Sequence, residues 1–481
     1  MATMVQVIRK LPRVFWISNI MELFERWAWY GMYNALALYL TLSRDTGALG
    51  FSDAEKGIII GTGSMLLYFL PLITGAIADK IGYKKMLILS FLSYMAGYYM
   101  VGHFQNFGWV FFAYIFLATA GALFKPIISA VVAKTTDEET SSIGFGIFYM
   151  MVNIGGFIGP FISGLVYKVS WDYVFYVSIA VIALNFIIVL FFFREPGGEE
   201  GEDGETLGSK ILKAFENILV TLTDWKYVLF LTIMAIFWTA FNQLYYTFPT
   251  FINDWVNFDQ LSASVGLAPG KITAVGLTSL DAFFIIVLQL FISSVAMRFK
   301  PLHAMIVGII ILSGGLFFMF SSMNGWIVIF GILVFAIGEM ASSPKFTEYV
   351  GRIAPPDKKA LYMGTSFLPI AAAHFLAGLL SGKAYANIGA RFTLLQKEVA
   401  ARGIDIPAVG ETFTKNDYMQ MAAEKMNMSP AELTQYLWSH YHPNKVWMLY
   451  TGIALSAAFF LFLYDRFVLK GVDVSKNGNR F

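Results

Sequence analysis

The sequence predicts an all-α integral membrane protein with about twelve transmembrane helices in two six-helix bundles. The 481 residues are 57% hydrophobic and only 14% charged, whereas a soluble protein of this length carries about 25% charged residues. About twelve apolar stretches are long enough to cross a bilayer, which takes roughly 20 residues. They fall into two groups of six around a polar break at residues 194–225, which suggests paired bundles around a central cavity.

The predicted spans follow one another through mostly short connections. We assign residues 1–193 to an N-terminal bundle, residues 226–466 to a C-terminal bundle and residues 467–481 to a cytoplasmic tail. The spans are predicted near residues 15–43, 56–78, 84–103, 107–134, 142–168, 172–193, 226–252, 272–298, 301–321, 325–350, 361–386 and 446–466.

The break at residues 194–225 is predicted to be a cytoplasmic linker. From Glu195 to Glu205 it is rich in glycine and acidic residues, a composition that cannot bury a core and behaves as a flexible tether. Residues 209–222 have an amphipathic pattern, and we expect them to form a helix on the membrane surface.

The connection at residues 387–445, between the last two spans, is far longer than ordinary loops. Within it, Ser429, Pro430 and Glu432 form the capping pattern that starts helices, and residues 418–426 have helical composition. We expect a small helical cap on the extracytoplasmic mouth of the bundle. A subdomain that docks a partner or captures substrate is the alternative.

Lysine and arginine gather in the connections of one face, which the positive-inside rule assigns to the cytoplasm. Both termini are then cytoplasmic, and we expect the protein in a bacterial inner membrane. Residues 1–13 are short and basic, like a cytoplasmic arm and unlike a cleaved signal peptide. The basic residues concerned are Arg9, Lys10, Arg13, Lys80, Lys84, Lys85, Lys210, Lys213, Lys226, Arg298, Lys300, Arg352, Lys358 and Lys359.

Net charge and side-chain chemistry exclude several classes of protein. A formal net charge of +2 argues against a nucleic-acid partner, which favours a concentrated basic surface. The lack of cysteine excludes disulfides, thiol catalysis and cysteine-based metal sites. No catalytic triad, zinc-protease or phosphate-loop pattern stands out. We therefore expect no enzyme activity, no metal and no cofactor.

The first predicted span carries two carboxylates and a guanidinium among apolar residues. At about 100° per residue, Glu22, Glu25, Arg26, Trp29 and Tyr33 fall on one helical stripe. Charge at that depth is costly and is retained for transport, proton relay or ligand pairing. Arg26 is predicted to pair with Glu22, four residues back, or with a carboxylate on another helix.

Two motifs resemble those of a known family. Residues 75–85, between the second and third spans, resemble the signature loop of the major facilitator superfamily, with Asp79 between two glycines and a basic end. The first span resembles the Glu-x-x-Glu-Arg-Phe-x-Tyr-Tyr-Gly motif of the proton-dependent oligopeptide transporters in that superfamily. The resemblance implies the major facilitator fold and proton-driven peptide symport by alternating access. Here the motif reads Glu22-x-x-Glu25-Arg26-Trp27-x-Trp29-Tyr30-Gly31.

Further motifs extend the resemblance into both halves. Lys125, deep in the fourth span, stands where the family has its substrate-carboxylate lysine. In Gly338-Glu339-x-x-x-Ser343-Pro344 on the tenth span, the resemblance implies that Glu339 receives the amino terminus of a peptide and that Ser343 lines the site. On the fifth span, Tyr149 and Asn153 either line the cavity or make interhelical hydrogen bonds.

Glycines and aromatic residues complete the expected cavity. Gly155 and Gly159 allow the close approach of another helix. Aromatic side chains are candidates for tolerant apolar pockets, although at helical spacing most aromatics serve packing. The candidates are Trp29, Tyr30, Tyr33, Trp238, Tyr245 and Tyr246.

Three positions depart from the family pattern. Asn242 stands in the seventh span where the family usually has glutamate, and Asp281 stands in the eighth where it usually has asparagine. His374 stands in the eleventh span where the family often has asparagine. It is a minor candidate for titration near neutral pH, because a lone histidine in a membrane span is more often a hydrogen-bonding packing residue.

The charges expected in the cavity are unbalanced. Four acids against two bases leave an excess of two carboxylates, which protonation or a cation must compensate. We expect the coupled proton on Glu22 or Glu25 first and on Asp281 next, and a substrate amine at Glu339. The carboxylate of the same zwitterion would meet the bases on the other bundle, Arg26 and Lys125.

These observations predict a proton-coupled symporter of di- and tripeptides or similar small zwitterions, powered by the proton gradient. Its expected partners are that substrate, protons and the lipid bilayer, and we expect a monomer. One alternative is a divergent family member that carries another solute, such as a modified amino acid, a peptidoglycan fragment or an organic ion. The other is a membrane receptor or sensor without turnover.

Overall fold

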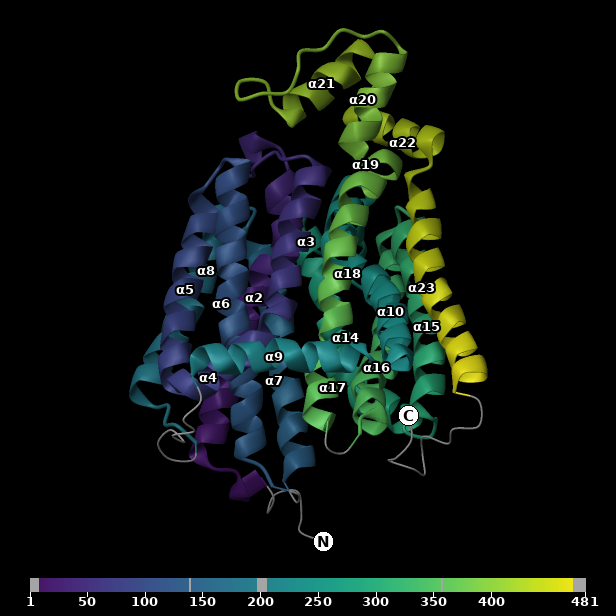
Figure 1. Ribbon diagram of the computed structural model, residues 1–481. Coiled ribbons are helices and arrows are strands. Elements are labelled where there is room, and N and C mark those ends of the chain that lie inside the picture. The colour runs from purple at the N-terminus through teal and green to yellow at the C-terminus, as the bar shows by residue number, and fades with distance from the viewer. Residues whose placement is uncertain (1–7, 138–139, 197–205, 356–357, 470–481) are drawn as a thin grey trace.

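The computed structural model describes residues 8–137, 140–196, 206–355 and 358–469. All regular structure in these residues is helical, which confirms the predicted all-α class. Nine helices are long and apolar enough to cross a membrane, and the bent pair α3 (Asp53–Phe69) and α4 (Pro71–Ile81) makes a tenth crossing. α2 (Arg13–Thr41) and α5 (Tyr83–His103) are not among these ten but run beside them (Figure 1), and counting both gives the predicted twelve.

The first six crossings form one bundle (Figure 1). Ser52 and Glu55 make the capping box that starts α3. The second crossing bends by 48° between α3 and α4, where Pro71 removes a backbone donor and begins the new helix. The remaining members are α6 (Phe107–Lys134), α7 (Ser141–Val166) and α8 (Trp171–Phe191).

The last six crossings form the second bundle, and two of them are broken. The seventh, predicted as a single span, consists of α10 (Trp225–Phe241), α11 (Gln243–Tyr246) and α12 (Phe248–Trp255), with Asn242 and Thr247 at the breaks. The eleventh consists of α17 (Lys359–Thr365), α18 (Leu368–Leu379), a π-helical turn (Leu380–Ala384) and α19 (Tyr385–Ile388). The others are α14 (Ala274–Ala296), α15 (Pro301–Ser321), α16 (Gly325–Ile353) and α23 (Val446–Leu463), while the short α13 (Phe258–Ser264) precedes α14.

Glycines bring α2 and α7 into close contact at the centre of the N-terminal bundle. A Cβ on Gly155 would collide with the backbone of Leu23 and Trp27, and a Cβ on Gly159 would collide with the backbone of Trp27 and Gly31. This confirms the close approach predicted from the two glycines of α7. The charged stripe of α2 is therefore held directly against α7.

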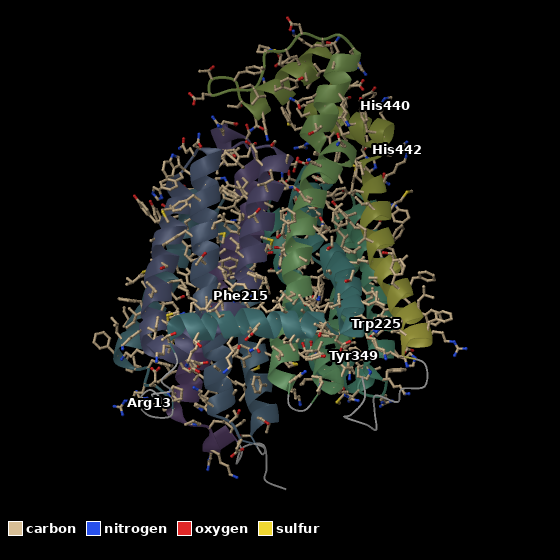
Figure 2. All side chains as sticks on the ribbon, in the orientation of Figure 1. Arg13, Phe215, Trp225, Tyr349, His440 and His442 are labelled. Carbon is tan, nitrogen blue, oxygen red and sulfur yellow. The ribbon has the colours of Figure 1, made fainter. Side chains whose placement is uncertain are left out.

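α9 (Leu207–Leu222) confirms the helix predicted in the linker. It lies across both bundles near one end (Figure 1) and packs against α4, α10 and α17. Leu212, Phe215 and Leu219 recur at helical spacing and are 71%, 43% and 65% exposed, with Phe215 labelled in Figure 2. An uncovered apolar stripe of this kind suits a membrane interface. Most of the predicted acidic tether, residues 197–205, and most of the predicted tail, residues 470–481, lie outside the described residues.

A helical cap stands at the end opposite α9 and consists of α20 (Arg391–Ala401), α21 (Lys415–Lys425) and α22 (Pro430–Tyr441) (Figure 1). The predicted capping box of Ser429 and Glu432, with Pro430 in the first turn, is confirmed. Glu398 of α20 accepts hydrogen bonds from the hydroxyls of Tyr436 and Tyr441, each at 2.8 Å. These bonds fasten α20 to α22.

Candidate functional site

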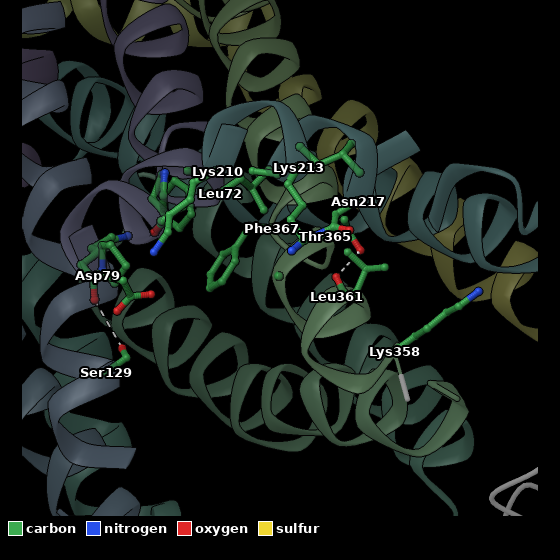
Figure 3. A pocket seen from close by; sticks show the side chains of 18 of the residues that line it. Leu72, Asp79, Ser129, Lys210, Lys213, Asn217, Lys358, Leu361, Thr365 and Phe367 are labelled. Carbon is green, nitrogen blue, oxygen red and sulfur yellow. Dashed lines mark hydrogen bonds between the residues drawn. The ribbon is translucent and has the colours of Figure 1, made fainter. Parts of the chain in front are cut away.

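A cavity of about 1140 Å³ lies between the bundles and is lined by residues of both. α9 contributes Lys210 and Lys213 to its wall, and Leu361 and Thr365 of the neighbouring α17 lie close to them (Figure 3). Asp79 and Ser129 lie across the cavity from these residues. The cavity therefore opens toward the face that carries α9 and α17, where α2 also begins and α23 ends (Figure 1). Its other polar and charged lining residues are Glu22, Arg26, Lys125, Asn217 and Lys358.

The charged stripe of α2 is buried and internally paired. Arg26 Nε donates to Glu25 at 2.5 Å and lies 3.3 Å from a carboxylate oxygen of Glu22. The Tyr94 hydroxyl donates to the same Glu25. The predicted pairing of Arg26 with Glu22 is confirmed, and Glu25 shares the same guanidinium. One base between two ionised acids leaves the stripe with a net charge of −1.

Lys125 of α6 supplies the second positive charge on this side. Its Nζ lies 3.6 Å from the centroid of the Tyr68 ring, and it lines the same cavity as Glu22 and Arg26. No ion pair to Lys125 exists within the described chain. An ammonium held over an aromatic face at a cavity wall is available to an incoming anion.

Asp281 of α14 and Glu339 of α16 hold their carboxyl groups within hydrogen-bonding distance of each other. Asp281 is 5% exposed. Asp281 Oδ1 and Glu339 Oε2 have no hydrogen-bond partner among the described residues, and no described lysine or arginine forms an ion pair with either group. Two buried carboxyl groups this close repel each other when both are ionised, which favours a proton on one of them.

Tyrosines connect the charge groups of the two bundles. The Tyr30 hydroxyl is within electrostatic reach of both Arg26 and Glu339, and Arg26 Cζ lies 5.8 Å from the centroid of the Tyr30 ring. The Tyr245 ring centroid lies 6.2 Å from that of Tyr30 and 5.3 Å from that of Tyr33. An aromatic surface therefore extends from the base-containing side toward the acid pair.

Asn242 and Ser343 hold polar atoms without hydrogen-bond partners among the described residues, namely Nδ2 of Asn242 and Oγ of Ser343. Asn242 is 3% exposed and sits at the break between α10 and α11. Ser343 follows Glu339 by one helical turn on α16. Buried groups of this kind are uncommon in proteins, and each calls for a functional or structural explanation.

Only part of the predicted site gathers around the large cavity. Of the predicted residues, Glu22, Arg26 and Lys125 line it, while the other nine do not belong to its described lining. On α7, Phe148 and Val152 face the cavity in place of their neighbours Tyr149 and Asn153. The Asn153 side chain donates to the Tyr149 carbonyl of its own helix at 2.8 Å, so this bond is not the interhelical one that was the alternative to lining the cavity.

The six aromatic candidates differ in how deeply they are buried. Trp29, Tyr33 and Tyr246 are buried in the packed interior, as expected for residues that serve packing. Tyr30, Trp238 and Tyr245 are only partly buried. Tyr30 and Tyr245 are therefore the candidates that remain closest to the predicted role.

Tyr68 and Tyr94 were missing from the predicted site, although they contact Lys125 and Glu25 directly. Neither belongs to a polar motif, and a tyrosine within an apolar span resembles any other packing aromatic. His374 is buried, stacks on Tyr68 with ring centroids 4.7 Å apart, and bonds the Tyr246 hydroxyl at 3.0 Å. These contacts fit the packing interpretation of His374. Within the described residues, no group of three acidic or histidine side chains could hold a metal ion.

Proteins that are similar to this chain in sequence are membrane transporters. The sequence model of the Major Facilitator Superfamily matches residues 16–378. The chain is 25% identical to an uncharacterised transporter of this superfamily, YqjV of Bacillus subtilis, over 354 residues, covering 73% of this chain and 81% of YqjV. It is also 25% identical to dipeptide and tripeptide permease A of Yersinia pestis over 433 residues, covering 77% and 83%.

The fold comparison extends over nearly the whole chain. A crystal structure of a peptide transporter, POT, in complex with sulfate superposes with a TM-score of 0.68 at 17% identity, and covers 97% of this chain and 99% of that one. At this identity the likeness establishes the fold. Taken with the family match over most of the sequence, it shows that the chain belongs to the Major Facilitator Superfamily of membrane transporters.

Proposed function

We propose that the chain is a secondary active transporter that carries small peptides or peptide-like zwitterions together with protons. The observation that carries this proposal is the separation of charge between the bundles. Lys125 on the N-terminal side has no ion-pair partner in the described chain, and the Asp281–Glu339 pair on the C-terminal side has no base. A molecule with a carboxylate at one end and an ammonium at the other complements both sides.

The ligand orientation follows from these charges. Its carboxylate lies at Lys125, which lines the same cavity as the Arg26 guanidinium. Its ammonium lies at the Asp281–Glu339 pair, and Asn242 and Ser343 supply buried polar atoms on the same bundle. Tyr30 and Tyr245 line the route between the two ends. Their faces accept varied apolar side chains without strict shape requirements.

The coupled proton is best placed on the Asp281–Glu339 pair. On the N-terminal side two acids meet two bases, so those charges cancel without a proton. On the C-terminal side both excess carboxyl groups lie together, and leaving both ionised in a buried site is costly. With one shared proton the pair keeps a net charge of −1, which matches one substrate ammonium. Glu22 and Glu25 remain candidates for a second proton.

Alternating access is the transport mechanism we propose, because the substrate bridges two bundles that can rock about the site. The basic face with α9 and α17 is assigned to the cytoplasm of a bacterial inner membrane, and both termini lie on that side. The transporter acts as a monomer and needs no cofactor beyond the proton gradient. The name of the permease relative supports the peptide as substrate.

The deciding experiment is uptake of labelled dialanine by purified protein in liposomes, with and without an inward proton gradient. Accumulation that needs the gradient and is competed by other dipeptides is the expected result. Absence of uptake by correctly folded protein would reject the peptide as substrate. Binding without net flux would favour a receptor or sensor.

A second candidate is a transporter of another small organic solute. It is favoured by Asn242 and Asp281, which depart from the oligopeptide-transporter pattern at the expected substrate site. One carboxylate is lost at Asn242 and one is gained at Asp281, so the negative charge that faces the ligand changes its place within the site. A thermal-shift screen of zwitterions and organic ions tests this candidate, which requires stabilisation by a compound other than a peptide.

A further inference from the structure

The cap is joined to the C-terminal bundle through α19 and α23, yet it also binds the N-terminal bundle. Lys415, in the first turn of α21, donates from Nζ to the backbone carbonyls of Thr41 at 2.8 Å and of Phe51 at 2.9 Å. Thr41 is the last residue of α2, and Phe51 precedes α3. One cap side chain therefore ties together the outer ends of two helices of the other bundle.

The next residue, Asn416, adds two contacts to the same segment. Its backbone amide donates to Ser43 Oγ at 3.1 Å, and its side chain donates to Asp45 at 2.7 Å. A capping box of Thr414 and Asp417 fixes the first turn of α21, which holds Lys415 and Asn416 in place. The contact thus rests on an ordered helix end.

Charged groups from three elements surround the lysine. Burial lowers the pKa of the Lys415 ammonium, and the carboxylates of Asp53 on α3 and Asp254 on α12 oppose that shift. Asp254 also pairs with Arg391 of the cap at 3.8 Å, and Asp53 pairs with Lys56 at 2.8 Å. Hydrogen bonds from an ammonium are roughly twice as strong as neutral ones.

The two bundles are in direct contact beneath the cap. A Cβ on Gly57 of α3 would collide with the carbonyl of Gly378 on α18, and the Tyr246 hydroxyl donates to the Ile60 carbonyl at 3.3 Å. The large cavity opens at the other end of the molecule. Opening the cap end would therefore require the outer ends of α2 and α3 to move away from α18 and from the cap.

We propose that α21 is an outer latch, in which Lys415 and Asn416 hold the N-terminal bundle against the C-terminal one and must release it before the transporter can open on the cap side. This inference rests on the alternating access of the proposed function. It assigns to the long connection between the last two helices a role in the transport cycle. Release of the latch then contributes to the barrier for reorientation.

The first test measures the opening of the cap side without any substrate. Because the chain lacks cysteine, spin labels can be attached at Gln105→Cys and Ala268→Cys, two exposed positions on outer loops of opposite bundles. Lys415→Met removes both bonds to the backbone carbonyls. The expected result in liposomes is a roughly tenfold larger population at long label-to-label distance.

Lys425→Met is the matched control, because this lysine belongs to the same helix but donates to the Asp405 carbonyl within the cap. It should leave the distance distribution unchanged. An unchanged distribution in Lys415→Met, or an equal change in Lys425→Met, would overturn the latch. Since no substrate is involved, this readout is independent of whether peptides are transported.

The second test fixes the latch in place. Ser43→Cys combined with Asn416→Cys puts two thiols next to each other, because the backbone amide of Asn416 donates to the side chain of Ser43. Oxidation, or a short bifunctional thiol reagent, should abolish the long-distance population and also any gradient-driven uptake, and reduction of the disulfide should restore both. The single variants are controls. Undiminished opening in the cross-linked protein would refute the proposal.

Discussion

At the residue scale, charge is balanced in one bundle and unbalanced in the other. Arg26 is shared by Glu22 and Glu25. Lys125 is the second base of this bundle, so two bases balance two acids. Asp281 and Glu339 have only each other within the described chain. The excess of two carboxylates that the sequence predicts is therefore concentrated on the C-terminal side, where a proton and a substrate ammonium can compensate it.

Lys125→Ala should lower kcat/KM for a zwitterionic substrate by about 30-fold or more, equivalent to roughly 2 kcal/mol, because the ligand carboxylate loses its charge partner. The measurement is initial uptake in liposomes. Lys134→Ala is the matched control, since Lys134 lies on the same helix, also over an aromatic ring (Tyr83, 4.5 Å), but outside the described cavity lining. Equal effects of both substitutions would contradict a ligand role for Lys125.

Asp281→Asn should reduce gradient-driven accumulation about tenfold and leave substrate exchange largely intact. The amide cannot share an acid proton with Glu339, so proton coupling is lost while the site keeps one carboxylate for the ammonium. Accumulation and exchange are measured in the same liposomes. The control is Asp259→Asn, an exposed aspartate outside the spans. Full accumulation by Asp281→Asn would place the coupled proton elsewhere, with Glu22 next to be tested.

At the element scale, helix breaks and close contacts position the site. The seventh crossing breaks at Asn242, which aims Tyr245 toward α2. Gly155 and Gly159 hold the charged stripe against α7. In the cap, hydrogen bonds to Glu398 join the helices in addition to apolar contacts.

The cap should lose stability in acid. Although burial opposes the shift, hydrogen bonds from Arg402, Tyr436 and Tyr441 lower the pKa of Glu398 below its ordinary 4.5. A carboxyl group whose pKa is lowered in the folded state stabilises the protein at any pH above its ordinary pKa. That stabilisation is lost as the pH falls through the lowered pKa. Glu398→Gln should therefore lower the melting temperature at pH 7 through a loss of about 1–3 kcal/mol. The difference from wild type should shrink as the pH falls below 4.5 and through the lowered pKa of Glu398. A constant difference would contradict this account.

At the scale of the whole molecule, the two ends differ. One end holds a cavity of about 1140 Å³ beneath α9, and the other is closed by helix contacts and covered by the cap (Figure 1). This asymmetry corresponds to a single state of an alternating-access cycle. The basic connections lie at the cavity end, which is the end that the proposed orientation assigns to the cytoplasm.

Orientation in the membrane can be measured with single cysteines in the cysteine-free chain. Ser129→Cys lines the cavity and should react with an impermeant thiol reagent in inside-out vesicles but not in intact cells. Gln105→Cys, on the cap side, should show the opposite pattern. Reaction of Ser129→Cys from outside intact cells would reverse the assigned orientation.

Much of the architecture could be predicted because its causes are local. Ten of the twelve crossings follow from apolar length, α9 from its amphipathic period, and the start of α22 from the pattern at Ser429 and Glu432. The breaks in the seventh and eleventh crossings could not be predicted in this way. Both stretches are long and apolar enough to be taken for single spans. Apolar length does not register the prolines, Pro249 and Pro369, that stand in the first turn of the helix after a break.

The sequence by itself determined the membrane class, the spans and the pairing of Arg26 with Glu22, since each depends on the chemistry or spacing of residues within one helix. Only the tertiary structure decided that Asp281 meets Glu339, that Lys125 lies over Tyr68, and that Lys415 reaches Thr41, 374 residues away. Such contacts depend on how helices far apart in the chain cross and pack. Packing is set by the shapes of all the buried side chains together, so no local pattern encodes it.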